Sequence, residues 1–182
     1  MNWRSGSVLA LALTILSCSV TGAGQERDTG LDAALKKFPG YHLLSLQERD
    51  SDTRAYFVQH FGMSNPSVVL GDFDGDGHPD YALILKNNKS GATKLVVLLC
   101  PAQDQCRSVY DVDVTTDAGS IYIRPIPVGT RVNQTEAIDS KNHAAPLKLT
   151  SPGIRVEYFG QAEVVLYWNK KLMKIAEIQT ED

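Results

Sequence analysis

The residues best suited to chemistry are four aspartates that share one short stretch of the chain: Asp72, Asp74, Asp76 and Asp80. Gly75 and Gly77 lie among them. Carboxylates at alternating positions of a tight loop can converge on one hard cation, and calcium accepts six to eight oxygen ligands in a flexible geometry. Glycine adopts positive φ angles without steric cost, which lets such a loop curl. The pattern therefore predicts a calcium site.

The spacing assigns a role to each position of this loop. Counted from Asp72, the second and third aspartates occupy positions three and five, the backbone carbonyl of His78 falls at position seven, and Asp80 falls at position nine. We expect these five protein ligands, with water completing the shell. A polar turn that binds no metal is the alternative. An EF-hand would carry Glu at position twelve, where this chain has Leu83, so the EF-hand is excluded.

Residues 71–82 resemble the calcium loop of the FG-GAP and VCBS family, which lies between adjacent β-strands. The resemblance implies that Asp72, Asp74, Asp76 and Asp80 coordinate calcium. Large members of that family repeat the unit around a propeller, but this chain has one copy, and the other acidic cluster, at 111–117, lacks the glycines. The resemblance therefore implies neither a full propeller nor an adhesion function. The whole chain resembles small bacterial exported proteins that carry one such loop.

The N-terminus has the layout of an export signal. Residues 1–17 combine Arg4 with an apolar run at 8–16 that is too short to span a bilayer comfortably. Residues 15–18 resemble a bacterial lipobox, which would make Cys18 a lipidated N-terminus. Cleavage of a plain secretory signal near Ala23 is the alternative.

These features predict where the protein works. Residues 18–29 are polar and glycine-containing, as in a lipid-anchored or flexible tether. We expect a protein exported to the bacterial cell envelope, lipid-anchored at the outer membrane or in the periplasm, or alternatively secreted. Its contact with the membrane would be through the N-terminal lipid alone.

Cysteine usage agrees with this compartment. The chain has three cysteines, an odd count that an exported protein must account for. If Cys18 carries lipid, Cys100 and Cys106 remain as a pair that could close a short loop. Two free thiols are the alternative, and the spacing fits no zinc site. We favour a disulfide.

Hydrophobic periodicity predicts helices near the N-terminus of the folded part. Apolar residues at 31–38 have helical spacing and stop at a Pro-Gly pair. A second helix is expected from an N-cap at Ser51–Asp52 to Gly62, with Ala55, Val58 and Phe61 on its buried face. Between the two helices, residues 41–46 are apolar and fit a short strand or irregular packing.

The rest of the chain reads as extended. Strands are expected at 67–71 and 81–86, on either side of the aspartate loop. Residues 94–100 are apolar enough for a strand that is buried on both faces. Residues 106–114 should pair with that strand, next to the disulfide. Pro125 and Pro127 exclude the strand at 121–123 from a central position. Residues 130–147 should form a long loop. Residues 154–158 should form a strand with one face exposed to solvent. A hairpin should form from 164–168 and 172–178, with its turn at 169–170.

The predicted fold class is therefore α+β. One or two N-terminal helices should precede a mainly antiparallel β-sheet, with the calcium loop between two of its strands. Residues 30–182 should form a single globular domain.

Function is less determined than fold. The net charge is −3 and no basic face is present, which argues against nucleic acid as a partner. The four histidines are scattered and no nucleophile or phosphate-loop motif occurs, so the sequence favours a non-enzymatic protein. Four aromatic residues near the C-terminus could line a partner or glycan surface, although strand aromatics more often form core: Tyr158, Phe159, Tyr167 and Trp168.

Two hypotheses follow. The first is a calcium-stabilised extracytoplasmic module that binds a protein or glycan. The second is an envelope hydrolase in which calcium only supports the scaffold. A deep pocket with histidine or further carboxylates would favour the hydrolase, and a flat aromatic patch would favour the binding module.

Overall fold

The computed structural model describes residues 29–62, 64–102, 105–114, 118–133 and 146–180. The predicted signal, Cys18 and the tether up to residue 28 lie outside the described residues. Within the described part, none of the helices has both the length and the apolar character needed to cross a bilayer.

The described elements follow one another along the chain with two α-helices, one short 3-10 helix and eleven strands. They are α1 (Thr29–Leu35), β1 (Tyr41–Leu43), η1 (Leu46–Glu48), α2 (Ser51–Phe61), β2 (Val68–Gly71), β3 (Asp80–Asn87), β4 (Thr93–Leu99), β5 (Arg107–Val114), β6 (Ile121–Ile126), β7 (Arg131–Val132), β8 (Leu147–Lys148), β9 (Gly153–Tyr158), β10 (Ala162–Asn169) and β11 (Lys174–Thr180).

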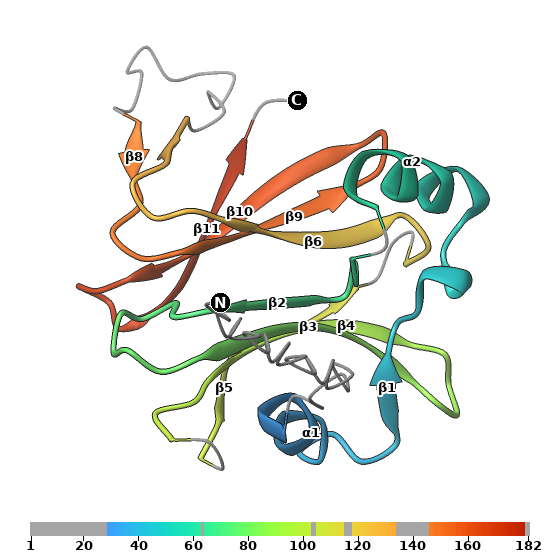
Figure 1. The fold of residues 1–182 in the computed structure, drawn as a ribbon, viewed down its shortest axis with the longest axis horizontal. Helices are drawn as coiled ribbons and strands as arrows, with labels where there is room; N and C mark the ends of the chain where they lie inside the picture. The colour runs from blue at the N-terminus through green and yellow to red at the C-terminus, as the bar shows by residue number, and fades with distance from the viewer. Residues whose placement is uncertain (1–28, 63, 103–104, 115–117, 134–145, 181–182) are drawn as a thin grey trace, which may run out of the picture.

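Two antiparallel sheets pack face to face (Figure 1). The first has the order β1-β3-β4-β5, with β2 also paired to β3, and the second has the order β11-β10-β9-β6. A short β7–β8 ladder forms a third sheet. Every described strand pair is antiparallel. Helices beside mainly antiparallel strands fit the predicted α+β class, but the single sheet that we expected is two stacked sheets and a ladder.

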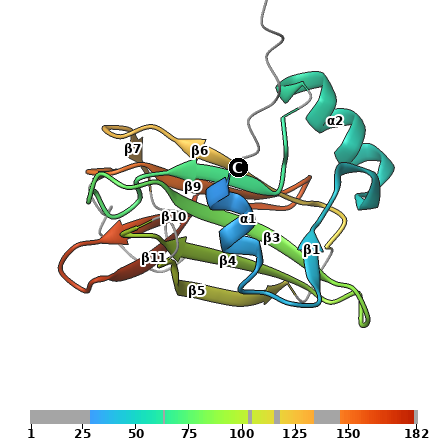
Figure 2. The ribbon, with the colours of Figure 1, turned by 60° about the horizontal axis from the view of Figure 1, so that its bottom comes forward.

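The central strands β3 and β4 are both buried on their two faces, which the apolar run at 94–100 predicted for β4. On β3, Ala82 and Ile84 face the core between the sheets, whereas Leu83 and Leu85 face a second core on the outside of the sheet. Helix α1 covers that outer face, with Ala34 fully buried (Figure 2). Apolar side chains on both faces of a strand require such a cover.

Helix α2 ends as predicted, at Gly62 with a φ of 68°, but it presents a different face. Its N-cap is Asp50, one residue before the expected position. Thr53 and Phe57 are buried, whereas Ala55 and Val58 of the predicted face are exposed. The Phe57 ring packs 5.4 Å from that of Tyr122 on β6. The position of β6 therefore decides which stripe of the helix is buried, and local periodicity could not predict this.

The C-terminal half confirms one expectation and corrects two. Strand β6 lies at the edge of its sheet, as Pro125 and Pro127 predicted, although it continues through Pro125 to Ile126. The ends of the predicted loop at 130–147 pair as β7 and β8, and its residues 134–145 lie outside the described part. The β10–β11 turn holds residues 170–173 rather than two residues, because the Asn169 side chain accepts hydrogen bonds from the backbone of the turn.

Candidate metal centre

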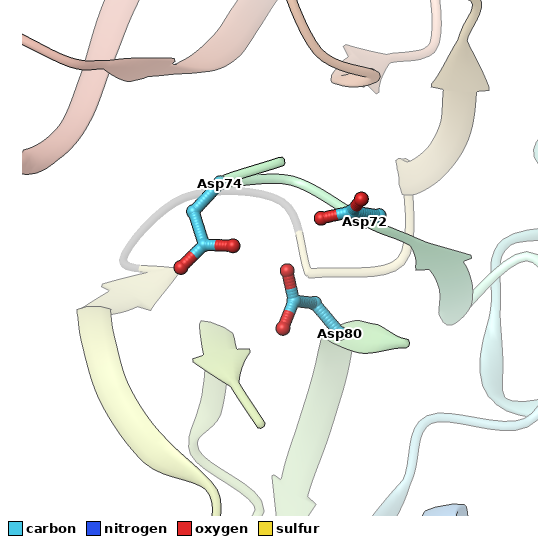
Figure 3. Close-up of side chains that lie close together, drawn as sticks. All are labelled: Asp72, Asp74 and Asp80. Carbon is cyan, nitrogen blue, oxygen red and sulfur yellow. The ribbon is translucent and has the colours of Figure 1, made fainter. Parts of the chain in front are cut away.

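The aspartate loop connects two neighbouring strands, as the sequence predicted. Strands β2 and β3 pair antiparallel, with Gly71 opposite Asp80. Figure 3 shows Asp72 and Asp74 on the loop and Asp80 on the strand, with their carboxylates turned towards a common space. One oxygen from each of these three side chains lies within 4.8 Å of the other two.

This separation fits a calcium ion. Calcium–oxygen distances are about 2.3–2.6 Å, so two ligands of the same ion are at most about 5 Å apart. Three carboxylate oxygens within 4.8 Å of one another meet that limit. Oxygen ligands from carboxylates are also the chemistry that calcium prefers. The cluster could therefore hold a metal ion.

Hydrogen bonds to the Asp72 side chain stabilise the curled conformation of the loop. The Asp72 carboxylate accepts hydrogen bonds from three backbone amides, those of Gly75 at 2.8 Å, Asp76 at 3.0 Å and Gly77 at 3.0 Å. Gly75 and Gly77 have φ angles of 81° and 90°, in the left-handed region that residues with a Cβ rarely adopt. The two glycines thus let the chain wrap around the first aspartate.

Asp80 ties the loop to the rest of the sheet. Its carboxylate is fully buried and accepts hydrogen bonds from the backbone amides of Phe73 and Cys100, both at 2.8 Å. Burial raises the pKa of Asp80 to about 6; the two amides oppose the shift, and Asp74 and Asp76 add to it. This carboxylate is therefore both a candidate ligand and a structural acceptor.

The predicted disulfide is present beside this site. Cys100 and Cys106 are bonded, which joins the end of β4 to the start of β5. Because the Cys100 amide donates to Asp80, the disulfide lies next to the buried member of the carboxylate cluster.

The other two predicted ligands lie differently. Asp76 is not part of the carboxylate cluster; its side chain accepts a hydrogen bond from the His78 amide at 2.8 Å. Both residues are exposed. The predicted contribution of His78 is its backbone carbonyl, and this role stays a prediction.

Two residues at the site were not predicted: Lys170, in the turn between β10 and β11, and Ser151, in the loop between β8 and β9. The Lys170 ammonium lies 3.6 Å from the position that a Cβ on Gly75 would occupy. The Ser151 hydroxyl donates to the Phe73 carbonyl at 2.5 Å. Nothing in the spacing of the sequence places these residues beside the loop, because only the packing of the two sheets brings them there.

The C-terminal aromatics do not form one surface. Tyr158 and Phe159 line one cavity and Tyr167 and Trp168 line another, each of about 370 Å³. Trp168 is only 5 % exposed and belongs to the core between the sheets. The predicted core role is therefore confirmed for Trp168.

Comparison of the chain with protein-family models found no match, and neither did comparison with curated proteins or with solved structures. The resemblance to the FG-GAP and VCBS calcium loop thus stands on the sequence motif.

Proposed function

We propose that this protein is a calcium-stabilised module of the bacterial cell envelope that binds a protein or glycan partner. The observation that carries the metal part is the cluster of Asp72, Asp74 and Asp80 on a loop with two left-handed glycines. Calcium would be held by these carboxylates and would offset their mutual repulsion. The ion would then fix the connection between β2 and β3.

Calcium should act on stability. A ligand that binds only the folded protein stabilises it by about 2.7 kcal/mol when its free concentration is about 100 times its dissociation constant. Thermal unfolding of the wild type should therefore shift upwards with calcium and downwards with a chelator. Asp74→Ala should unfold at one temperature in both conditions. If the midpoint of thermal unfolding of the wild type were the same with calcium and with chelator, the proposed metal site would be refuted.

An extracytoplasmic location is the second part of the proposal. The disulfide between Cys100 and Cys106 supports it, because such bonds persist in oxidising compartments. Cys18 would carry the lipid anchor. Cys18→Ser should then move the protein from the membrane fraction to the soluble fraction of a bacterial lysate, and unchanged membrane partition would argue against lipidation.

A further inference from the structure

A second candidate site lies beside α2, in a cavity of about 370 Å³. We name it the aromatic cleft and define it by six of its lining residues: Tyr56, Tyr122, Glu157, Tyr158, Phe159 and Glu163. They come from α2, β6, β9, the β9–β10 turn and β10. The volume falls within the range of about 300–1,000 Å³ that is usual for small-ligand sites.

One wall of the aromatic cleft is a row of hydrogen-bonding groups. Tyr122, Glu157 and Glu163 are direct neighbours across three paired strands, so their side chains share one face of the sheet. The Tyr122 hydroxyl donates to Glu157 at 2.5 Å. Burial, then the hydrogen bond to Glu157, raises the pKa of Tyr122, which keeps this hydroxyl protonated. The row is fixed before any ligand arrives.

Both carboxylates in this row are held in ion pairs with arginines, so they are not the further free carboxylates that would favour a hydrolase. Arg124 donates to Glu157 through two of its nitrogens, and Arg155 donates to Glu163 at 3.0 Å. The two pairs bring no net charge to the wall. Carboxylate oxygens have about four lone-pair positions, so each glutamate keeps capacity for further donors.

Another part of the lining is aromatic. The rings of Tyr56 and Phe159 lie 5.0 Å apart, and both side chains are half-buried. Phe57 and Phe61 hold α2 against the Tyr122 ring, at 5.4 Å and 6.1 Å. The aromatic wall is therefore anchored to the same strand that supplies the polar wall.

We propose that the aromatic cleft binds a neutral saccharide. A sugar offers hydroxyl donors to the glutamate and tyrosine oxygens and an apolar C–H face to the rings, which matches the two walls. A cation would instead require uncompensated negative charge, and the arginines remove it. This inference rests on the binding role proposed above, but it does not depend on calcium.

The test is calorimetric titration of the full chain with three neutral probes, maltotriose, cellotriose and chitotriose, and with choline as a cationic probe. At least one trisaccharide should bind, with the same affinity in calcium and in chelator. Tyr56→Ala should weaken this binding at least about fivefold. Glu157→Gln, which keeps the shape of the side chain, should also weaken it. Tyr167→Ala, an aromatic truncation in the other cavity, is the matched control and should leave it unchanged.

Three results would overturn the inference: no binding of any trisaccharide, binding that survives both cleft variants, or binding of choline alone. Calcium-dependent melting is measured on the same samples. If melting responds to calcium while the saccharides fail, the inference falls and the calcium proposal stands. If the saccharides bind but the melting temperature does not change with calcium, the inference stands and the calcium proposal falls.

Discussion

The aspartate loop and the aromatic cleft lie at opposite ends of β10, near its turns to β11 and β9 respectively, and they are built in opposite ways (Figure 1). The hydrogen bonds within the loop join residues no more than seven positions apart. In the cleft, the bonds from Tyr122 and Arg124 to Glu157 span 35 and 33 positions. The ligands of a site made from one contiguous segment can be predicted from the spacing of its residues. A site made from distant strands forms only after the sheets have packed.

Asp80 is an exception among the aspartates of the loop, because it also makes a contact that is distant in the sequence. It accepts a hydrogen bond from Cys100, 20 positions away, and is the most buried member of the carboxylate cluster. The comparison can therefore be tested by separating the contribution of Asp80 to the metal from its contribution to the sheet.

The largest effect is expected from Asp80→Ala. This change leaves the buried amides of Phe73 and Cys100 without an acceptor, and unsatisfied buried donors cost about 1–3 kcal/mol each. We expect a loss of about 3 kcal/mol in unfolding free energy in chelator, where no metal contributes. Asp74→Ala is the matched control, because it removes a carboxylate of the cluster whose side chain is not buried in the sheet. Equal chemical denaturation curves for the two variants in chelator would show that Asp80 has no separate structural role.

Arg49→Ala should damage the cleft end and spare the loop. Arg49 is 4 % exposed and donates to the Ile121 carbonyl and the Ser67 hydroxyl, so it connects β6 to the first sheet. Burial lowers its pKa to about 10. Losing these charged hydrogen bonds should cost about 2–3 kcal/mol by urea denaturation.

The calcium-dependent increment should survive in Arg49→Ala, because the loop lies at the other end of the sheets. Arg54→Ala is the control, because the half-buried Arg54 side chain makes a long hydrogen bond, of 3.4 Å, to the Gln47 carbonyl; this change should alter stability by less than about 0.5 kcal/mol. If Arg49→Ala abolished the stabilisation by calcium, the structure of the aspartate loop would depend on distant contacts and not on its own residues alone.

The smallest effect is expected at Lys170. Its ammonium lies beside Gly75 and would repel a cation held by the loop through solvent, where charge interactions are weak. Lys170→Ala should raise calcium affinity by about twofold at low salt, with less effect at high salt. Lys89→Ala, at the exposed turn between β3 and β4, should not change it. Calcium titration of the three proteins measures this, and a weaker affinity in Lys170→Ala would mean that the lysine supports the loop instead.

Local signals explain why much of the fold was predictable. Gly62 ends α2 because a residue with a positive φ is needed there, and Pro125 restricts β6 to a sheet edge. The pairing of Cys100 with Cys106 followed from the cysteine count and the short separation. The buried face of α2 was predicted correctly at Phe61, which packs on Tyr122, and wrongly at Ala55 and Val58, because the contact of Phe57 with Tyr122 sets the orientation of the helix.

By itself the sequence determined the carboxylates, the glycines that curl their loop, the disulfide, and the extended segments that became strands. These depend on residues close together in the chain, whose geometry is limited by local φ angles and short loops. Only the tertiary structure decided that the strands divide into two stacked sheets, that Lys170 and Ser151 reach the loop, and that Tyr56 and Glu157 line the same cleft. Such contacts depend on which apolar faces bury each other, and spacing along the chain does not encode that choice.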